Sequence, residues 1–394
     1  MAHPMRGATA ITGFGMTPMG RIYKSTTELA ADATRTALAD SGLKKDQIDG
    51  LLINAGITGS TGGGVSLGLQ NYLGLKNLRL LNHMNAAGST AAQMVQYAAL
   101  AIAAGMANHV LCVFSDAPLK DGSSAGAAYG GARSPQRPRG MAGLYPAAGY
   151  YGANTPYALA ARRHMATYGT TQDQLGIIAV GQRAWATRNP LAQMRDPITL
   201  EDYHNSRWII EPLHLLDCCL VSNGAVAVIV SSAAAAKEMP QPPVYIWGMG
   251  QGHPGDAARA GSEWETETGG QAAAKTAYAM AGVGPGDITV AELYDCYTYT
   301  VLVTLEDYGF CKKGEGGPFV EDGKLGPGGS LPTNTGGGEL SGYYMWGMTP
   351  LSEAIIQGRG HGGDRQVKND VVLATGNGGS LSYHACLILS PHAN

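Results

Sequence analysis

Two segments of the chain repeat one order of apolar and amphipathic stretches. In the first, an amphipathic stretch at 25–43 lies between apolar stretches at 9–16 and 47–56, and the same order recurs between residues 242 and 295. Short continuous apolar runs are typical of buried strands, and amphipathic runs that end at a glycine are typical of helices. Each segment therefore predicts a strand, a helix and a strand.

The stretches that follow also correspond. Residues 85–116 and 336–379 each contain a turn, a long helical pattern and an apolar strand. Alternating helices and nearly continuous apolar strands favour a parallel or mixed α/β sheet covered on both faces. We expect two similar lobes, an N-terminal half at 1–240 and a C-terminal half at 241–394. The first half carries an insertion at about 118–205, in which 121–140 is expected to be a loop.

A predicted helix starts just after a turn in both lobes, at residues 85–90 and 343–350. Helix N-termini present free N–H groups and partial positive charge. If a pseudo-two-fold axis relates the lobes, both helix starts can face one central pocket. Such a pocket could stabilise negative charge that develops on an oxygen.

Charge and composition exclude several classes of function. Charged residues make up 14% of the chain, apolar residues 44%, and the net charge is -3, so nucleic acid is not an expected partner. No apolar run reaches the length of about 18 residues that a membrane span needs. The first residues lack an apolar signal segment, and the six cysteines match no metal-binding spacing. We therefore expect a cytoplasmic protein with free thiols and no metal.

Three stretches resemble one family over nearly the whole chain: "YALAARRHMATYGTTQDQLGIIAVGQRAWATRNPLA", "PLHLLDCCLVSNGAVAVIV" and "AELYDCYT". They are similar to the thiolase superfamily, in its sterol-carrier or lipid-transfer-protein type. The resemblance implies two βαβαβαββ halves in a five-layered αβαβα arrangement. It also implies a homodimer that acts on acyl-CoA thioesters, with CoA entering as part of the substrate and no separate cofactor.

The catalytic residues that the resemblance implies are replaced in this chain. Asn85 stands where such thiolases have a nucleophilic cysteine, three residues before the glycine of Gly-Ser-Thr. Tyr294 takes the place of the histidine in a His-Asp-Cys-Phe segment, and Tyr344 that of the histidine in Gly-His-Pro. Asparagine cannot form an acyl-enzyme, which excludes thiolysis by that route.

Paired tyrosines in these positions resemble the thiolase-like aldolases of bacterial steroid side-chain degradation. Those enzymes cleave a β-hydroxyacyl-CoA with a tertiary alcohol by a retro-aldol reaction, leaving a ketone and propionyl-CoA. They work with a small OB-fold protein, for which a zinc ribbon is one form that the resemblance allows. Tyrosine can donate a proton or accept one as phenolate, but ionising it at pH 7 costs about 4 kcal/mol. We therefore expect Tyr294 and Tyr344 to form a proton relay without a standing phenolate.

Other residues are supporting candidates, each with a plain structural alternative. Asn85 could hydrogen-bond the thioester oxygen or act as a spacer, and Asp295 more readily caps or orients its neighbours than titrates. His384 could handle a proton or only satisfy the fold. Tyr343, Gly378 and Gly379 are candidates for the pocket wall or substrate contact. Basic residues that could hold the CoA phosphates, or be solvated surface residues, are Arg133, Arg137, Arg139, Arg183 and Arg188.

Two other functions stay open from the sequence. The chain could be a thiolase-type acyltransferase with another nucleophile, for which Cys296 is the candidate. It could also be a non-catalytic thiolase-like subunit that scaffolds a partner. A covalent adduct with an acyl-CoA would favour the first, and inactivity with the correct partner present would favour the second.

Overall fold

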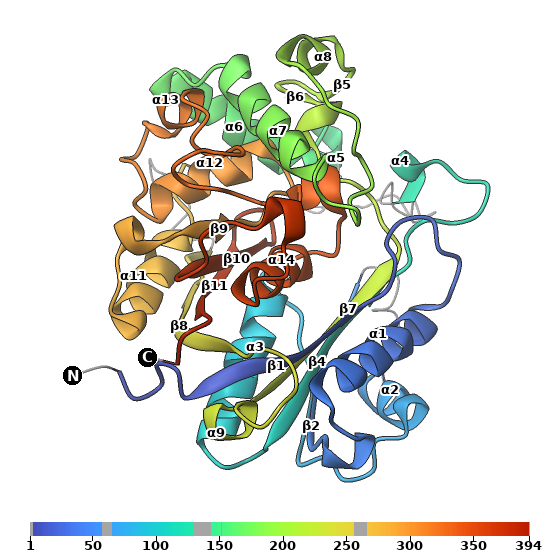
Figure 1. The fold of residues 1–394 in the computed structure, drawn as a ribbon. Coiled ribbons are helices and arrows are strands. Elements are labelled where there is room, and N and C mark those ends of the chain that lie inside the picture. Colours follow the sequence, from blue (N-terminus) through green and yellow to red (C-terminus); the bar gives the residue numbers. More distant parts are fainter. Residues whose placement is uncertain (1–2, 57–64, 129–142, 151, 256–265, 394) are drawn as a thin grey trace.

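The computed structural model of the chain describes residues 3–56, 65–128, 143–150, 152–255 and 266–393. Nine strands in the described part form one mixed sheet (Figure 1). Their order is β3 (Leu80–His83), β2 (Gly50–Ala55), β4 (His109–Asp116), β7 (Gly224–Ser232), β1 (Thr9–Met16), β8 (Val244–Gly252), β11 (Tyr383–Ser390), β10 (Val372–Gly378) and β9 (Val290–Glu292).

The strand order repeats outward from the junction of β1 and β8. β1 pairs with β7, β7 with β4, and β4 with β2; β8 pairs likewise with β11, β11 with β10, and β10 with β9. The last pair is parallel on both sides and the others are antiparallel. The two strands at the junction are antiparallel to each other, with Ile11 opposite Val244. This arrangement confirms the two similar halves expected from the sequence.

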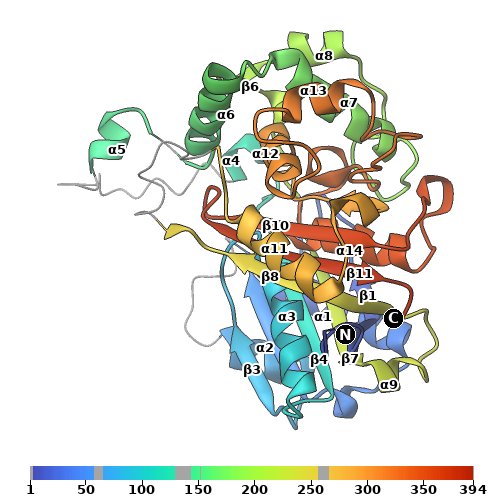
Figure 2. The same ribbon diagram turned by 90° about the vertical axis from the view of Figure 1, so that its left-hand side faces the viewer.

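Helices divide the molecule into layers. α1 (Thr26–Ser41) packs on β1, β4 and β7, and α11 (Gly270–Ala281) packs on β8 and β11. α3 (Thr90–Ala103) contacts β4 and β7 of the first half and β10 and β11 of the second; α14 (Met348–Gly358) contacts β9, β10 and β1. α3 and α14 therefore lie between the two halves, as a five-layered αβαβα fold requires (Figures 1 and 2).

The outer helices lie very close to their strands because glycines face them. A Cβ atom at Gly15 of β1 would lie 2.2 Å from the carbonyl oxygen of Ala33 in α1. A Cβ atom at Gly250 of β8 would lie 1.9 Å from the carbonyl oxygen of Ala273 in α11. The sequences "GFG" and "GMGQG" thus place the same close packing in both halves.

The insertion covers one end of the second half. α7 (Gln172–Ala186) contacts α12 (Thr298–Asp307) and α13 (Gly316–Glu321), with α6 (Asn154–Tyr168) in the same group of helices (Figures 1 and 2). α8 (Leu200–Asn205) packs on α7. His164 Nε2 lies 3.1 Å from Glu306 Oε2, which joins α6 to α12. Of the loop expected at 121–140, residues 125–128 form a short helix and 129–140 lie outside the described residues.

The remaining elements are short. They are α2 (Val65–Leu73), α4 (Ala125–Ala128), α5 (Leu144–Ala147), α9 (Ala233–Ala236), β5 (Trp208–Ile210) and β6 (Leu213–His214). A π-helical turn at Gly338–Gly342 precedes α14. Within the described ranges, none of the helices combines the length and the apolar character needed to cross a membrane.

Candidate active site

Tyr294 and Tyr344 meet at the centre of the fold. Tyr294 follows β9, and its backbone N–H donates to Thr375 Oγ1 of β10 at 3.0 Å. Tyr344 lies in the turn before α14, and its backbone N–H donates to Ser222 Oγ at 3.0 Å. Their phenol oxygens are 3.1 Å apart and hydrogen-bonded. Two residues chosen from the sequence for different motifs are therefore direct partners.

Both phenols are held in the neutral form. Tyr294 is 4% exposed and Tyr344 is half-buried. Burial raises the pKa of both tyrosines well above 10, and the nearby Glu339 carboxyl and other titratable neighbours raise it further. A low-dielectric site disfavours the charged phenolate. A standing phenolate is therefore costly, whereas proton transfer along the hydrogen bond remains possible.

The turn at 85–90 presses against this pair. A Cβ atom at Gly88 would lie 2.3 Å from two ring carbons of Tyr294 and 2.2 Å from the carbonyl oxygen of Asn377. A Cβ atom at Gly347, in the turn before α14, would lie 2.1 Å from the carbonyl oxygen of Gly88. The starts of α3 and α14 thus lie against each other and against the tyrosines, which agrees with the single central site expected from the repeat.

The two turns have the same conformation. Ala87 and Trp346 both have positive φ, 48° and 50°. The backbone N–H of Ala86 donates to Thr90 Oγ1 at 2.7 Å, and that of Met345 donates to Thr349 Oγ1 at 2.9 Å. Non-glycine residues rarely adopt such φ values, and they concentrate at functional sites. By this correspondence Tyr344 occupies the same place in its half as Asn85 does in the first half.

Asn85 is exposed, and its side chain closes its own turn. Its Oδ1 accepts a hydrogen bond from the backbone N–H of Ala87 at 3.1 Å. The amide NH₂ group remains able to donate to a ligand oxygen. The structure thus accommodates both roles considered for this residue.

Asp295 anchors the turn that leads to Tyr344. Its carboxylate accepts hydrogen bonds from the backbone N–H of Glu339, at 2.8 and 2.9 Å, and of Leu340, at 3.1 Å. A Cβ atom at Gly338 would lie 2.2 Å from Asp295 Oδ2. Burial raises the pKa of Asp295 to about 7, and these hydrogen bonds oppose the rise. Asp295 therefore orients its neighbours.

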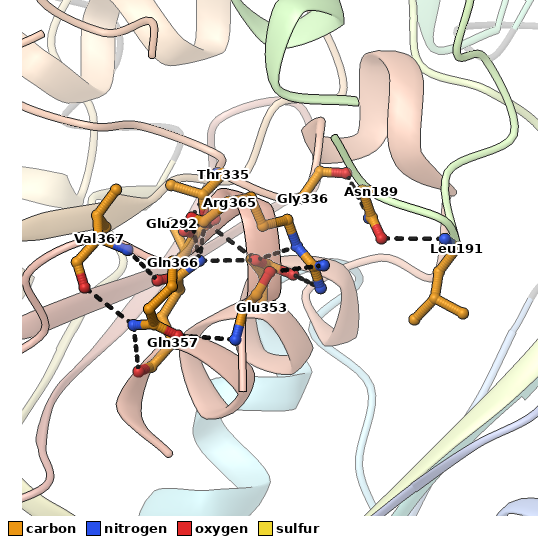
Figure 3. Close-up of polar contacts among 11 residues, drawn as sticks. Asn189, Leu191, Glu292, Thr335, Gly336, Glu353, Gln357, Arg365, Gln366 and Val367 are labelled. Atoms are coloured by element: carbon orange, nitrogen blue, oxygen red, sulfur yellow. Dashed lines mark hydrogen bonds and ion pairs between the residues drawn. The ribbon is translucent and has the colours of Figure 1, made fainter. Parts of the chain in front are cut away.

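Tyr343 points away from the phenol pair, because successive residues of an extended segment face opposite ways. It lines a small cavity with Glu292 and Glu353. Thr335 Oγ1 lies 2.8 Å from Glu292 Oε1 and 3.0 Å from Glu353 Oε1. Arg365 Nε donates to Glu353 Oε1 at 2.8 Å (Figure 3). This buried polar cluster supports the glycine-rich turn from behind.

Arg183 differs from its expected role. It is buried, its Nε donates to Ser341 Oγ at 2.9 Å, and its Nη1 donates to the carbonyl oxygen of Asp196 at 3.0 Å. Burial lowers its pKa. These contacts make Arg183 a support of the π-helical turn, which does not fit a contact with CoA phosphates. Arg188 is exposed. Arg133, Arg137 and Arg139 lie outside the described residues.

The last loop reaches the same site. A Cβ atom at Gly378 would lie 2.4 Å from the carbonyl oxygen of Ala86. Gly379, Ser380 and Leu381 have φ values of 58°, 53° and 71°, so three consecutive residues are left-handed. Such a run is strained at its two non-glycine positions. The loop thus places Gly378 against the Asn85 turn.

His384 lies on the other face of the sheet. It pairs with Asn377 in the β10–β11 register, and neighbouring Gly376 and Gly378 face the Asn85 turn. Directly opposite residues share a face, so His384 and Asn377 face away from that turn. The His384 ring lies 5.5 Å from the ring of Tyr308, and burial lowers its pKa to about 3. His384 is a neutral residue outside the phenol pair.

Cys296 is 4% exposed, and burial raises the pKa of its thiol well above the usual value. Nucleophilic cysteines need thiolate character. The other five cysteines in the described residues are also free, and burial raises the pKa of each thiol. The arrangement disfavours an acyltransferase that uses Cys296.

Sequence reasoning missed three residues around the pair. Ser222 and Thr375 hold the backbones of Tyr344 and Tyr294, and the carboxyl of Glu339 is close enough for its charge to act on both phenols. Glu339 left a signal, because it is a charged residue in the glycine-rich, apolar stretch "GGGELSG". No feature of the sequence distinguishes Ser222 and Thr375, because serine and threonine are common in strands and loops.

Comparison with known proteins gives the family. A family described as thiolase C-terminal domain-like matches residues 250–391. A steroid side-chain-cleaving aldolase of Thermomonospora curvata is 38% identical over 90% of this chain and 91% of its own. A 17-hydroxy-3-oxo-4-pregnene-20-carboxyl-CoA lyase of Mycobacterium tuberculosis is 35% identical over 90% and 92%.

A solved structure agrees with these relatives over the whole length. It is described as an Ltp2-ChsH2(DUF35) aldolase, superposes with a TM-score of 0.85 at 35% identity, and covers 98% of both chains. The chain therefore belongs to the thiolase superfamily, in the branch of lipid-transfer-protein-type, thiolase-like aldolases, and it is an enzyme of the lyase class.

Proposed function

We propose that this protein cleaves a β-hydroxyacyl-CoA with a tertiary alcohol by a retro-aldol reaction, giving a ketone and propionyl-CoA or a similar short acyl-CoA. The observation that carries the proposal is the 3.1 Å hydrogen bond between Tyr294 and Tyr344. It lies where a thiolase of the sterol-carrier type would have its histidines. The names of two relatives, a steroid side-chain-cleaving aldolase and a pregnene-carboxyl-CoA lyase, support a steroid thioester as the substrate.

The two phenols form a neutral proton relay. One phenol takes the proton of the substrate hydroxyl while it passes its own proton to the second phenol. The second phenol delivers its proton to the α-carbon. The substrate O–H and Cα–Cβ bonds break, and the ketone C=O and a new Cα–H bond form. The electron pair of the broken carbon–carbon bond passes through the thioester enolate, so no charge stays on the protein.

The replacement of the nucleophile suits this chemistry. In a retro-aldol reaction the thioester itself accepts the electron pair, and no acyl-enzyme is needed. Asn85 cannot take up an acyl group, which prevents competing acyl transfer. Its NH₂ group and the nearby starts of α3 and α14 are positioned to favour negative charge on the thioester oxygen.

We also propose two protein partners. A solved relative is described as an Ltp2-ChsH2(DUF35) aldolase, which supports a complex with a small OB-fold protein. The family resemblance supports a homodimer. Few charged residues and a large apolar fraction are consistent with extra surface buried in such assemblies.

The proposal is tested with the protein co-expressed and purified with its OB-fold partner. The complex is incubated with a β-hydroxyacyl-CoA that carries a tertiary alcohol and an α-methyl group, and the products are identified by mass spectrometry. We expect a ketone and propionyl-CoA in equal amounts. Absence of cleavage with the partner present, or a covalent acyl adduct on the protein, would overturn the proposal.

A further inference from the structure

Glu339 is a buried carboxyl in the segment that ends at Tyr344. Its side chain is 0% exposed, and neither carboxyl oxygen makes a well-formed hydrogen bond among the described residues; the backbone N–H of Asp295 is near enough only to oppose the rise in the pKa of the carboxyl. Its backbone is fixed on both sides. The N–H donates to Asp295, and the carbonyl oxygen accepts from the N–H of Leu220 at 2.9 Å. Leaving a carboxyl group buried without partners is costly, which suggests a role in function.

The groups around Glu339 come from three segments. Asp295, Tyr294 and Cys296 lie on the segment after β9, Cys219 lies on the segment before β7, and Tyr344 follows on its own segment. The carboxyl is close enough for its charge to act on all five of these groups. Glu339 is fully buried, so its carboxyl does not reach solvent and can influence the reaction only through these neighbours.

Two adjacent buried carboxyls cannot both ionise easily, so the donors decide which one carries the charge. Asp295 accepts from the N–H groups of Glu339 and Leu340 and is the better place for a negative charge. Burial first, and then the charge of Asp295, raises the pKa of Glu339 well above its usual range. Glu339 is therefore the protonated member of the pair.

We propose that Glu339 is a positioning residue, a neutral carboxylic acid whose ionisation stops the proton relay between Tyr294 and Tyr344. This inference rests on the proposed function. During the relay, partial negative charge develops on the phenol oxygens and on the thioester. A fixed, buried negative charge near them opposes that development. A neutral Glu339 leaves the relay free to work.

The test is the pH dependence of kcat for the complex with its partner. Wild type, Glu339→Gln and the surface control Glu238→Gln are compared. For wild type and control we expect kcat to decrease at a pH above 7, where Glu339 loses its proton after Asp295, whose pKa is about 7, has already ionised. The decrease should be about tenfold per pH unit for one ionising group. Glutamine cannot ionise, so Glu339→Gln should keep wild-type kcat at pH 7 and lose this decrease or show it only at higher pH.

Two results would overturn the inference: a Glu339→Gln profile that decreases as in wild type, or a kcat at pH 7 below one third of wild type. Infrared difference spectra of wild type minus Glu339→Gln give a readout that needs no activity. A protonated carboxyl band at pH 7 is expected, and an ionised one contradicts the inference. If wild type cleaves nothing, the proposed function fails instead, and the spectrum still reports the state of Glu339. If Glu339→Gln does not fold, the band is sought in the spectrum of wild type at pH 7 minus wild type at higher pH.

Discussion

At the scale of single residues, the proposed mechanism depends on two hydroxyl groups. Each phenol in a neutral relay must both accept and donate a proton, so removing either oxygen breaks the path. Tyr294→Phe and Tyr344→Phe should each reduce kcat by about 100-fold or more, the range of general acid–base catalysis. Steady-state kinetics with the partner present measure this, together with circular dichroism to confirm the fold.

The neighbouring residue supplies the control for that experiment. Tyr343 differs by one position but lines the cavity with Glu292 and Glu353. Tyr343→Phe should therefore keep kcat within about threefold of wild type, because its hydroxyl takes no part in proton transfer. Equal losses in all three variants would mean that the pair has no special role.

Cys296 allows a direct test of the acyltransferase alternative. Its thiol is buried and protonated, so Cys296→Ala should retain cleavage within about threefold, in contrast to the loss typical of a removed nucleophile. Intact-protein mass spectrometry after incubation with an acyl-CoA should show no adduct on wild type. An adduct that disappears in Cys296→Ala would establish the alternative.

His384 should make stability depend on pH. Burial lowers its pKa from 6.5 to about 3, so between these values the unfolded chain binds a proton and the folded chain does not. Stability therefore decreases as pH falls through this range. The free energy of unfolding of His384→Phe should have a slope against pH smaller by up to about 1.4 kcal/mol per unit near pH 5. Urea titrations at several pH values measure it, and equal slopes would contradict it.

At the scale of elements, the turns before α3 and α14 are the most constrained segments. A Cβ atom at Gly88 would collide with the Tyr294 ring and with the backbone of Asn377. Gly88→Ala should therefore cost about 2–3 kcal/mol, as overpacking does, and displace the phenol. The midpoint temperature of thermal unfolding and kcat should both decrease. Activity at the wild-type level would mean that the turn can shift at little cost.

Gly181 in α7 is the matched control. A Cβ atom there meets nothing within 4 Å. Gly181→Ala should leave kcat unchanged and raise stability by up to about 1 kcal/mol, because alanine favours a helix.

The sequence indicated which residues meet at the candidate site better than it indicated the residues that support them. Tyr294, Tyr344 and the place of Asn85 followed from motif positions, and the repeat indicated that both helix starts share one site. Arg183 was misread because a charge in an insertion resembles a surface ligand, and only its bonds to Ser341 and Asp196 show that it is structural. Glu339 was missed because its neighbours come from three distant segments.

At the scale of the whole molecule, the periodic pattern predicted most of the strands and helices of both halves. The predicted strands agree with the observed ones because buried strands such as β4 and β7 are apolar along nearly their whole length. β9 is shorter than expected, since only Val290–Glu292 pair in the sheet before the chain turns to Tyr294. The contacts of α7 with α12 and α13 could not be predicted, because no local pattern encodes which half an insertion will cover.

Gln96 links the two halves across the central layer. From α3 of the first half, its Nε2 donates to the carbonyl oxygens of Gly250 and Cys386, both at 3.0 Å. Gln96→Leu leaves these two carbonyls buried without the donor and should destabilise the protein by about 2–6 kcal/mol, at about 1–3 kcal/mol for each group. The midpoint of chemical denaturation measures the change.

Gln93 on the same helix serves as the control for this loss. Its Nε2 donates only to Ser89 Oγ within the helix, so Gln93→Leu should cost less than about 1 kcal/mol. Similar losses in both variants would show that the bonds between the halves contribute nothing beyond a local contact.

The matching turns at Ala86–Thr90 and Met345–Thr349 show that one backbone can present different side chains. Each turn is closed by a threonine hydroxyl, and the residue at the corresponding position before it is Asn85 in one half and Tyr344 in the other. The chemical group can therefore be exchanged without rebuilding the backbone that presents it. A duplicated fold of this kind therefore offers two equivalent positions at one site. A new reaction needs only a few substitutions at these positions.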